Sequence, residues 1–233
     1  MIGTIINSAS IIVGGLAGHF AGRLFKQDQQ DALQKTCGVS VLFIAIAGAM
    51  EGMLKIENGA LGSGKAMLVV LCLALGTMIG EALGIEGGVE RFGEWLKRKT
   101  GNGGDPAFVH AFVTASLTVC IGAMQDGIRG DFSTLAVKAV LDFIIIAVMT
   151  SSMGKGCAFS AIPVLLFEGA VTLLARMIAP VMTEGAVADL SLIGSVLIFC
   201  VGVNLVWGKK LRVANMLPAV VLAVLASYLP LGL

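Results

Sequence analysis

The stretch LSLIGSVLIFCVGVNLVW, residues 190–207, runs for eighteen residues without a charged side chain. A helix needs about 17 to 25 mainly apolar residues to cross the hydrocarbon core of a bilayer, so this stretch predicts a membrane-spanning helix. Charged, glycine-rich and proline-rich breaks divide the chain into eight predicted spans of this kind: 2–22, 38–54, 66–84, 108–124, 134–152, 157–179, 190–207 and 213–231. They lack the polar and apolar alternation of outer-membrane strands. The predicted fold class is therefore an all-α, polytopic transmembrane helical bundle.

The composition of the whole chain agrees with a membrane protein. Of its 233 residues, 57% are hydrophobic and 13% are charged, whereas soluble domains average about 45–50% apolar and about 25% charged residues. The mean hydropathy of +0.93 excludes a soluble globular enzyme and a disordered chain. The net charge of +1 provides no basic field for binding nucleic acid.

The lysine and arginine residues predict which side of the membrane each connection faces. Alternate connections hold eleven of these residues on one side and five on the other. Because positively charged loops are retained in the cytoplasm, the richer side is expected to be cytoplasmic and both termini are expected outside. No basic segment precedes the first apolar run, so we interpret that run as a span and not as a signal peptide.

Residues 85–99, in the longest predicted cytoplasmic connection, have the pattern of an amphipathic helix. Ile85, Val89, Phe92 and Leu96 recur at helical spacing, and charged residues occupy the opposite face. Such a helix is expected to lie on the inner leaflet of the membrane. A positional anchor is its commoner role, and a sensor that docks a partner is the alternative.

A weak internal repeat relates the two ends of the chain. Residues 40–47 of the second span match residues 195–202 of the seventh at an offset of 155, and similar matches link the third span to the eighth and the first to the sixth, at offsets of 149 and 152. A shift of five spans inverts the second copy in the membrane, and inverted repeats are typical of secondary transporters. The single membrane domain then divides into a first repeat at 1–84, linking elements at 85–156 and a second repeat at 157–233. Chance resemblance between apolar segments is the alternative.

Two carboxylates fall at the midpoints of predicted spans, Asp142 in the fifth and Glu168 in the sixth. A charged group at bilayer depth costs about 2.5–3.5 kcal/mol on insertion scales, which makes both residues candidates for function. On consecutive helices they could meet around one midplane cavity and there bind a cation or take up a proton. The alternative is that polar neighbours hydrogen-bond them and that they only fix helix packing.

Uncharged polar residues beside helix breakers are the next candidates for a pathway. Ser160 lies between two glycines and Pro163, and Asn215 is followed by Pro218. Proline in a span frees a backbone carbonyl, which is how broken helices expose polar backbone to a cavity. The expected pathway residues are completed by Asn7 and Gln125. Packing is the alternative, since serines and threonines in membrane helices usually bond their own preceding carbonyls.

Glycines four residues apart occur on two spans, at Gly14, Gly18 and Gly22 on the first and at Gly76 and Gly80 on the third. Such spacing lets two helix backbones approach closely. Packing within the chain is the simpler interpretation, and a homo-oligomer joined through these faces is the alternative. The five cysteines show no CxxC spacing and no partner histidine, so we expect small buried side chains and no disulfide, metal site or cofactor.

Two phrases of the sequence, FSAIP at 159–163 and ANMLP at 214–218, occur in an order and at a spacing that resemble one family. The chain is similar, over essentially its whole length, to the bacterial domain-of-unknown-function family 554, the YdfK/YqgA-like membrane proteins. The resemblance implies a polytopic protein of the bacterial inner membrane, described as a candidate transporter without an established substrate.

Two features depart from the pattern of that family. Met124 runs directly into Gln125 and an acidic-Gly pair, without the small apolar residues expected between them, so the fourth predicted span has only 17 residues. Glu168 stands where glutamine is expected, which questions whether a charge is essential there. Asp142 fits the pattern and is therefore the stronger candidate.

These observations favour a transporter or channel for a small solute or ion within the lipid bilayer. Cationic or proton-coupled cargo is favoured, because the midplane acids have no equally deep lysine or arginine, and Asp142 is expected to be the central ionisable group. The alternative is a membrane scaffold or sensor whose amphipathic helix docks a partner. An enzyme is not expected, since the sequence has no histidine-rich metal cluster or GxSxG elbow. The GxxxxGK pattern at 59–65 lacks the serine or threonine that should follow it and is interpreted as a loop.

Overall fold

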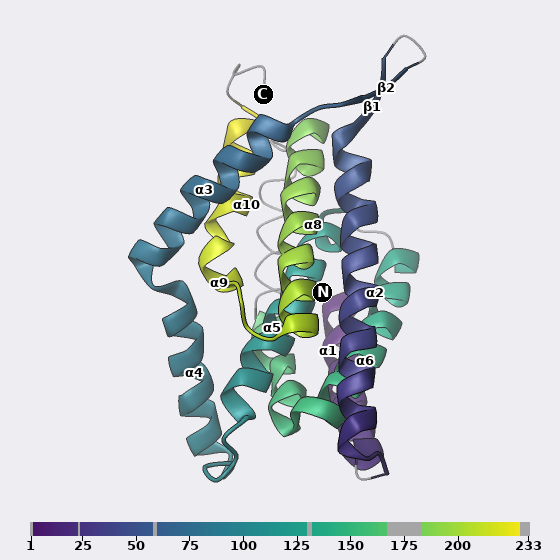
Figure 1. The fold of residues 1–233 in the computed structure, drawn as a ribbon, viewed down its shortest axis with the longest axis vertical. Coiled ribbons are helices and arrows are strands. Elements are labelled where there is room, and N and C mark those ends of the chain that lie inside the picture. The colour runs from purple at the N-terminus through teal and green to yellow at the C-terminus, as the bar shows by residue number, and fades with distance from the viewer. Residues whose placement is uncertain (1, 23, 58–59, 130–131, 167–182, 229–233) are drawn as a thin grey trace.

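The computed structural model describes residues 2–22, 24–57, 60–129, 132–166 and 183–228. Its α-helices are α1 (Ile2–Gly22), α2 (Gln27–Met53), α3 (Ala66–Leu83), α4 (Ile85–Lys99), α5 (Phe108–Arg129), α6 (Phe132–Met153), α8 (Glu184–Trp207), α9 (Val213–Met216) and α10 (Pro218–Ala226). A 3₁₀ helix, η1 (Lys155–Ser160), and two strands, β1 (Leu54–Glu57) and β2 (Ala60–Ser63), complete the described elements. The predicted all-α class is confirmed, with one small hairpin added (Figure 1).

Four of the described helices, α1, α2, α3 and α8, are long and apolar enough to cross a membrane. Shorter apolar helical segments occupy the other four predicted spans. The helix α3 ends one residue before the predicted span does, whereas α5 continues to Arg129 and has 22 residues. The helix α5 therefore extends five residues beyond the fourth predicted span, because the polar residues after the apolar run continue the same helix.

Two helices start earlier than the hydropathy pattern predicts. The helix α2 begins at Gln27, eleven residues before the predicted span, and α8 begins at Glu184, six residues before it. Capping explains the second start, since the Thr183 hydroxyl accepts a hydrogen bond from the Ala186 N–H at 3.2 Å and supplies a partner that the first turn of a helix lacks. Hydropathy marks the apolar part of a helix and not its ends.

A β-hairpin occupies most of the region predicted as a loop around residues 59–65. Leu54 pairs with Ser63 and Ile56 pairs with Leu61 in antiparallel register. The helix α3 begins directly after Lys65, which adopts a left-handed backbone with φ of 61°. The hairpin projects beyond the end of α2 at the top of Figure 1. Strands of four residues contain too few alternating positions for the sequence pattern to indicate them.

The first glycine series packs inside the chain. Gly14 and Gly18 lie against the backbone of α6 at Phe143 and Ala147, and Gly22 continues the same row. Contact positions increase together along the two helices, so α1 and α6 run parallel. A Cβ atom at Gly14 or Gly18 would overlap the α6 backbone, which is why this approach requires glycine.

Two further helix pairs also meet at glycines. The contacting positions are Gly38 with Val206, Gly52 with Leu192, Gly76 with Ala219 and Gly80 with Asn215. These positions increase in one helix as they decrease in the other, so α2 runs antiparallel to α8, and α3 runs antiparallel to α9 and α10. Both predicted glycine faces are therefore occupied within the chain, and a homo-oligomer would have to use other faces.

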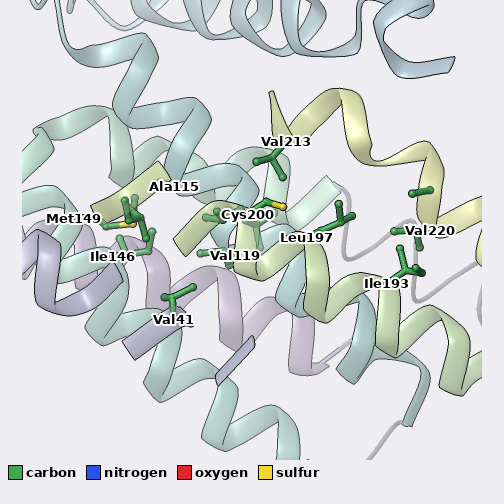
Figure 2. Packing of buried hydrophobic residues seen from close by; sticks show 14 of the residues in the cluster. Val41, Ala115, Val119, Ile146, Met149, Ile193, Leu197, Cys200, Val213 and Val220 are labelled. Atoms are coloured by element: carbon green, nitrogen blue, oxygen red, sulfur yellow. The ribbon is translucent and has the colours of Figure 1, made fainter. Parts of the chain in front are cut away.

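The main apolar core lies where α2, α5, α6, α8 and the α9–α10 segment meet (Figure 2). Val41 of α2, Val119 of α5, Met149 of α6 and Leu197 of α8 are all at most 3% exposed. Close packing of this kind, with van der Waals contact along the helices, is the main attraction between helices in a bilayer, where lipid is as apolar as leucine.

Helix breaks occur at the two places where glycine or proline predicts them. Gly154, with φ of 100°, separates α6 from η1, and a helical turn containing Pro163 follows η1. In the last predicted span, α9 ends at Met216 and α10 begins at Pro218. Proline suits the first residue of a helix because its missing N–H is not needed there.

The predicted amphipathic helix at 85–99 is confirmed as α4, but part of its apolar stripe packs against the protein. Leu96 is 5% exposed, and Gly93 lies against the Phe112 ring of α5. Phe92 and Trp95 stack with ring centroids 5.6 Å apart and stay partly exposed. Phe92 of the apolar stripe and the neighbouring Trp95 therefore stay accessible to lipid or to a partner protein.

Candidate functional site

A cavity of about 260 Å³ lies between α4, the start of α5, the end of α8 and the connection from α8 to α9. The polar residues that line it are Glu86, Glu90, His110, Thr114, Asn204 and Lys209. Most of the remaining wall is aliphatic, with valines from α5, α8 and α9. The cavity therefore combines charge with an apolar surface.

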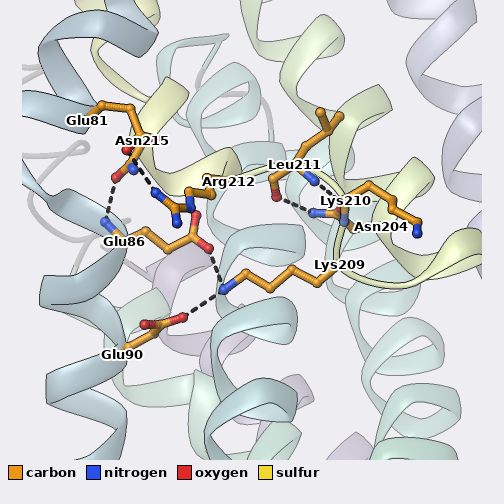
Figure 3. Close-up of polar contacts among 9 residues, drawn as sticks. All are labelled: Glu81, Glu86, Glu90, Asn204, Lys209, Lys210, Leu211, Arg212 and Asn215. Atoms are coloured by element: carbon orange, nitrogen blue, oxygen red, sulfur yellow. Dashed lines mark hydrogen bonds and ion pairs between the residues drawn. The ribbon is translucent and has the colours of Figure 1, made fainter.

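Glu86, in the first turn of α4, is the most deeply buried charged residue of the cavity wall. Its backbone N–H donates a hydrogen bond to the Asn215 Oδ1 at 2.7 Å, which ties the start of α4 to α9 (Figure 3). Its side chain is 6% exposed, and one carboxylate oxygen lies 2.6 Å from the Lys209 Nζ. The other oxygen, Oε2, is buried and has no hydrogen-bond partner among the described residues. An unsatisfied buried acceptor costs free energy, so the side chain of Glu86 is held here at a cost.

Lys209, on the connection between α8 and α9, holds two carboxylates together. Its Nζ lies 2.6 Å from Glu86 and 2.7 Å from Glu90. Burial alone would lower the pKa of Lys209, but the hydrogen bonds and charges of Glu86 and Glu90 outweigh it and raise the pKa above the ordinary 10.5. The contribution of Lys209 to stability is therefore fully present below its unfolded-state pKa and is lost only as the pH rises through the raised value.

A second ion pair lies on the other side of Asn215. The Arg212 Nη1 lies 3.0 Å from the Glu81 Oε2, and both side chains are largely exposed. Exposed ion pairs contribute little to stability. This pair joins Arg212 to a residue of α3 that does not line the cavity.

Asn204 fixes the backbone of the connection that carries Lys209. Its Nδ2 donates to the Leu211 carbonyl at 2.8 Å, and its Oδ1 accepts hydrogen bonds from the N–H groups of Lys210 and Leu211 at 2.8 and 2.9 Å. These bonds fold residues 208–212 back onto the end of α8 (Figure 3). Asn204 therefore positions Lys209, and its amide is already occupied by the chain itself.

A separate polar cluster ties the hairpin region to α8 and α10. The Lys65 Nζ lies 2.6 Å from the Asp189 Oδ1, and the Ser227 hydroxyl donates to the Asp189 Oδ2 at 2.7 Å. Asp189 is 7% exposed and Lys65 is also largely covered. This cluster joins three segments that are distant in the sequence and contributes no residue to the cavity.

The structure places the predicted pathway residues in different surroundings. Asn215 accepts the hydrogen bond from the Glu86 N–H described above, next to the cavity but not in its wall. The Ser160 hydroxyl is fully buried and donates to the Cys157 carbonyl at 2.6 Å, which fits the packing interpretation. Asn7 of α1 and Asp142 of α6 are also buried, with 1% and 6% exposed, and neither lines the cavity.

Three predicted pathway residues remain, Pro163, Glu168 and Gln125. Pro163 is partly buried in the turn after η1. Glu168 lies outside the described residues, and so does the side chain of Gln125. The predicted meeting of Asp142 with Glu168 therefore remains a prediction. Four cysteines, Cys37, Cys72, Cys157 and Cys200, are described, and all are free thiols.

Sequence reasoning missed the two residues at the centre of the cavity, Glu86 and Lys209. Both lie in segments that the pattern assigns to solvated connections between spans. The sequence offered one signal for this connection, Asn204. This amide lies in the last turn of an apolar span, and Gly-Lys-Lys follows that span at residues 208–210. The Asn204 amide bonds the backbone of the connection that carries the cavity lysine.

Known proteins resemble the chain along nearly its full length. It is 25% identical over 222 residues to the "Uncharacterized membrane protein YdfK" of Bacillus subtilis (strain 168), and the aligned region covers 95% of this chain and 93% of the relative. It is 27% identical over 233 residues to the "Uncharacterized protein YqgA" of Escherichia coli (strain K12), which covers 96% and 94%. No solved structure matches. The family described as "Protein of unknown function (DUF554)" matches residues 2–228, and the chain belongs to this family of membrane proteins.

Proposed function

We propose that the protein is a transporter or channel for a small solute or ion, with cationic or proton-coupled cargo favoured. The observation that carries the proposal is the cavity of about 260 Å³ with the buried carboxylate of Glu86 in its wall. A buried ionisable group in the wall of a cavity is a candidate for a functional site. A cavity that combines such a group with an aliphatic wall suits a small solute.

The pairing of helices supports an inverted-repeat architecture. The second and seventh predicted spans match in sequence, and the corresponding helices α2 and α8 pack antiparallel. The third and eighth spans also match, and α3 packs antiparallel to α9 and α10. A pseudo-two-fold axis in the membrane plane relates equivalent helices in this way. Transporters with such repeats bind their cargo at the interface between the two copies.

In this proposal Asp142 remains the central ionisable group of the pathway. Asn7, Ser160 and Pro163 shape its walls, Glu168 and Gln125 complete the set, and Asn215 links the pathway to the cavity. In this proposal α4 and the cavity face the cytoplasmic side of the bacterial inner membrane and both termini lie outside; the excess of lysine and arginine in alternate connections supports this orientation. We propose no catalytic role for these residues.

Flux through proteoliposomes tests the proposal. We expect the full chain to carry at least one member of a panel of inorganic cations, protons and small organic cations faster than protein-free liposomes do. Asp142→Asn keeps the size of the side chain and removes its charge, so flux of that cargo should fall by about tenfold or more. Flux that is the same in Asp142→Asn and in the unmodified protein would remove Asp142 from the mechanism, and the absence of flux for the whole panel would contradict transport.

A membrane scaffold or sensor is the second candidate, and the exposed pair Phe92 and Trp95 on α4 favours it. The Lys99 Nζ lies 5.1 Å from the centre of the Trp95 ring, so an aromatic and cationic surface continues along this helix. Surfaces of this composition suit an anionic lipid surface or a docked partner. The double substitution Phe92→Ser and Trp95→Ser separates the two functions, because it should abolish docking and leave flux unchanged.

A further inference from the structure

We propose that the cavity beside α4 binds a small organic cation, with its ammonium group held by Glu86 and Glu90 and its aliphatic part against the apolar wall. The inference rests on the proposed function in one respect, that the bound cation is the cargo. Binding itself can be measured without transport.

The charge of the cavity wall favours a cation. Glu86 and Glu90 carry two negative charges, and Lys209 carries one positive charge, so the wall has a net charge of −1 with His110 neutral. Low-dielectric walls strengthen the attraction that such a site exerts on an ion of opposite charge.

The carboxylate of Glu86 is the buried acceptor of the cavity wall. The side chain is 6% exposed, and Oε2 lacks a partner in the described part of the chain. A carboxylate oxygen accepts strongly from N–H groups that carry positive charge. An ammonium group that takes the place of the Lys209 Nζ would pair with this carboxylate, whereas an anionic ligand would be repelled by it.

Lys209 shows that the two carboxylates accept an ammonium group. Its Nζ is bound 2.6 Å from Glu86 and 2.7 Å from Glu90, at the end of a side chain that is 41% exposed. A flexible four-carbon stem lets such a group move into solvent without a change in the backbone. Lys209 is thus a tethered competitor whose place a solute ammonium can take.

The rest of the wall favours an organic cation over a bare metal ion. Val109, Val113, Leu117 and Val201 cover the cavity with aliphatic side chains. Hard metal ions such as Ca²⁺ take six to eight oxygen ligands, and the amide of Asn204 is already bonded to the backbone of its own connection. An alkyl chain, in contrast, gains from contact with this wall.

Isothermal titration of the detergent-solubilised full chain tests the inference with three matched probes, n-butylammonium, n-butanol and n-butyrate. We expect n-butylammonium to bind most tightly. Glu86→Gln should weaken this binding by about tenfold or more, because it removes the charge that strengthens the hydrogen bond to the ammonium group. Lys209→Gln should strengthen it, since the competitor is removed, and Lys210→Gln, which changes a neighbouring exposed lysine, should leave it within about twofold.

Three outcomes would overturn the inference: equal binding of n-butanol and n-butylammonium, unchanged binding in Glu86→Gln, or weaker binding in Lys209→Gln. If Glu86→Gln does not fold, Glu90→Gln removes the half-exposed second carboxylate and should weaken binding in the same direction. Binding of n-butylammonium without any flux would support this inference and contradict the proposed transport. Flux that does not depend on Glu86 would support transport and contradict this assignment of the cargo.

Discussion

Replacement of Gly80 by alanine is expected to destabilise the protein strongly. Gly80 is buried in α3, and a Cβ atom there would overlap the backbone carbonyl of Asn215 in α9. Neither backbone can move without displacing the contact between Asn215 and Glu86. Overpacking of this kind costs about 1–3 kcal/mol, and the upper end applies because the obstacle is backbone. We expect the midpoint of thermal unfolding in detergent, followed by tryptophan fluorescence, to fall by about 5–10 °C.

Gly87→Ala is the matched control for this substitution. Gly87 lies in α4, and a Cβ atom added there meets no atom within 4 Å. Alanine is a better helix former than glycine by about 0.5–1 kcal/mol, so this variant should unfold at the same or a slightly higher temperature. Equal midpoints for Gly80→Ala and Gly87→Ala would contradict the close approach of α3 to α9.

Lys65→Met is expected to have an effect of similar or larger size. It removes the cation that lies 2.6 Å from Asp189 and leaves a carboxylate that is 7% exposed, to which, among the described residues, the Ser227 hydroxyl remains bound. Removal of one partner from a buried ion pair costs about 3–5 kcal/mol, because the other charge is left uncompensated. Thermal unfolding of the variant in detergent should show the loss as a clearly lower midpoint.

The double variant Lys65→Met with Asp189→Leu separates the ion pair from other effects. Replacing both charges by apolar side chains of similar size removes the uncompensated carboxylate, and such exchanges are often neutral or stabilising. We therefore expect the double variant to recover most of the stability that Lys65→Met loses. A double variant as unstable as the single one would show that Lys65 acts through its position at the start of α3 and not through Asp189.

The helices were predictable because each apolar run is long and charge-free. The run at 66–84 predicts α3 almost residue by residue, and the pattern at 85–99 predicts α4. Helix ends were less predictable, because the early part of α2 at Gln27 is polar and hydropathy does not distinguish a polar helical turn from a loop. The hairpin at 54–63 is too short to leave a period in the sequence.

The cavity could not be predicted, because it depends on contacts between distant segments. The hydrogen bond between Glu86 and Asn215 joins residues 129 positions apart. Nothing in the local sequence around Lys209 indicates that its ammonium meets Glu86, since both residues have the pattern of exposed connections. The polar residue types could be read from the sequence, and the approach of α4 to the connection after α8 could not.

The sequence predicted that the two glycine series make close helix contacts, but it did not predict which helices they contact. Their four-residue spacing predicts close helix contact, and the structure shows this contact in α1 with α6 and in α3 with α9 and α10. Whether a glycine face meets another part of the same chain or a second copy depends on the whole arrangement of helices. Spacing along one helix carries no information on that choice.

Uptake by proteoliposomes, measured side by side for the unmodified protein, Glu86→Gln and Lys210→Gln, tests the central claim most directly. The claim is that a small cation passes through this bundle by way of the charged cavity. We predict saturable uptake for the unmodified protein and for Lys210→Gln, and a loss of about tenfold or more at low substrate concentration for Glu86→Gln. Equal uptake by all three proteins, or uptake no faster than in protein-free liposomes by folded protein, would contradict it.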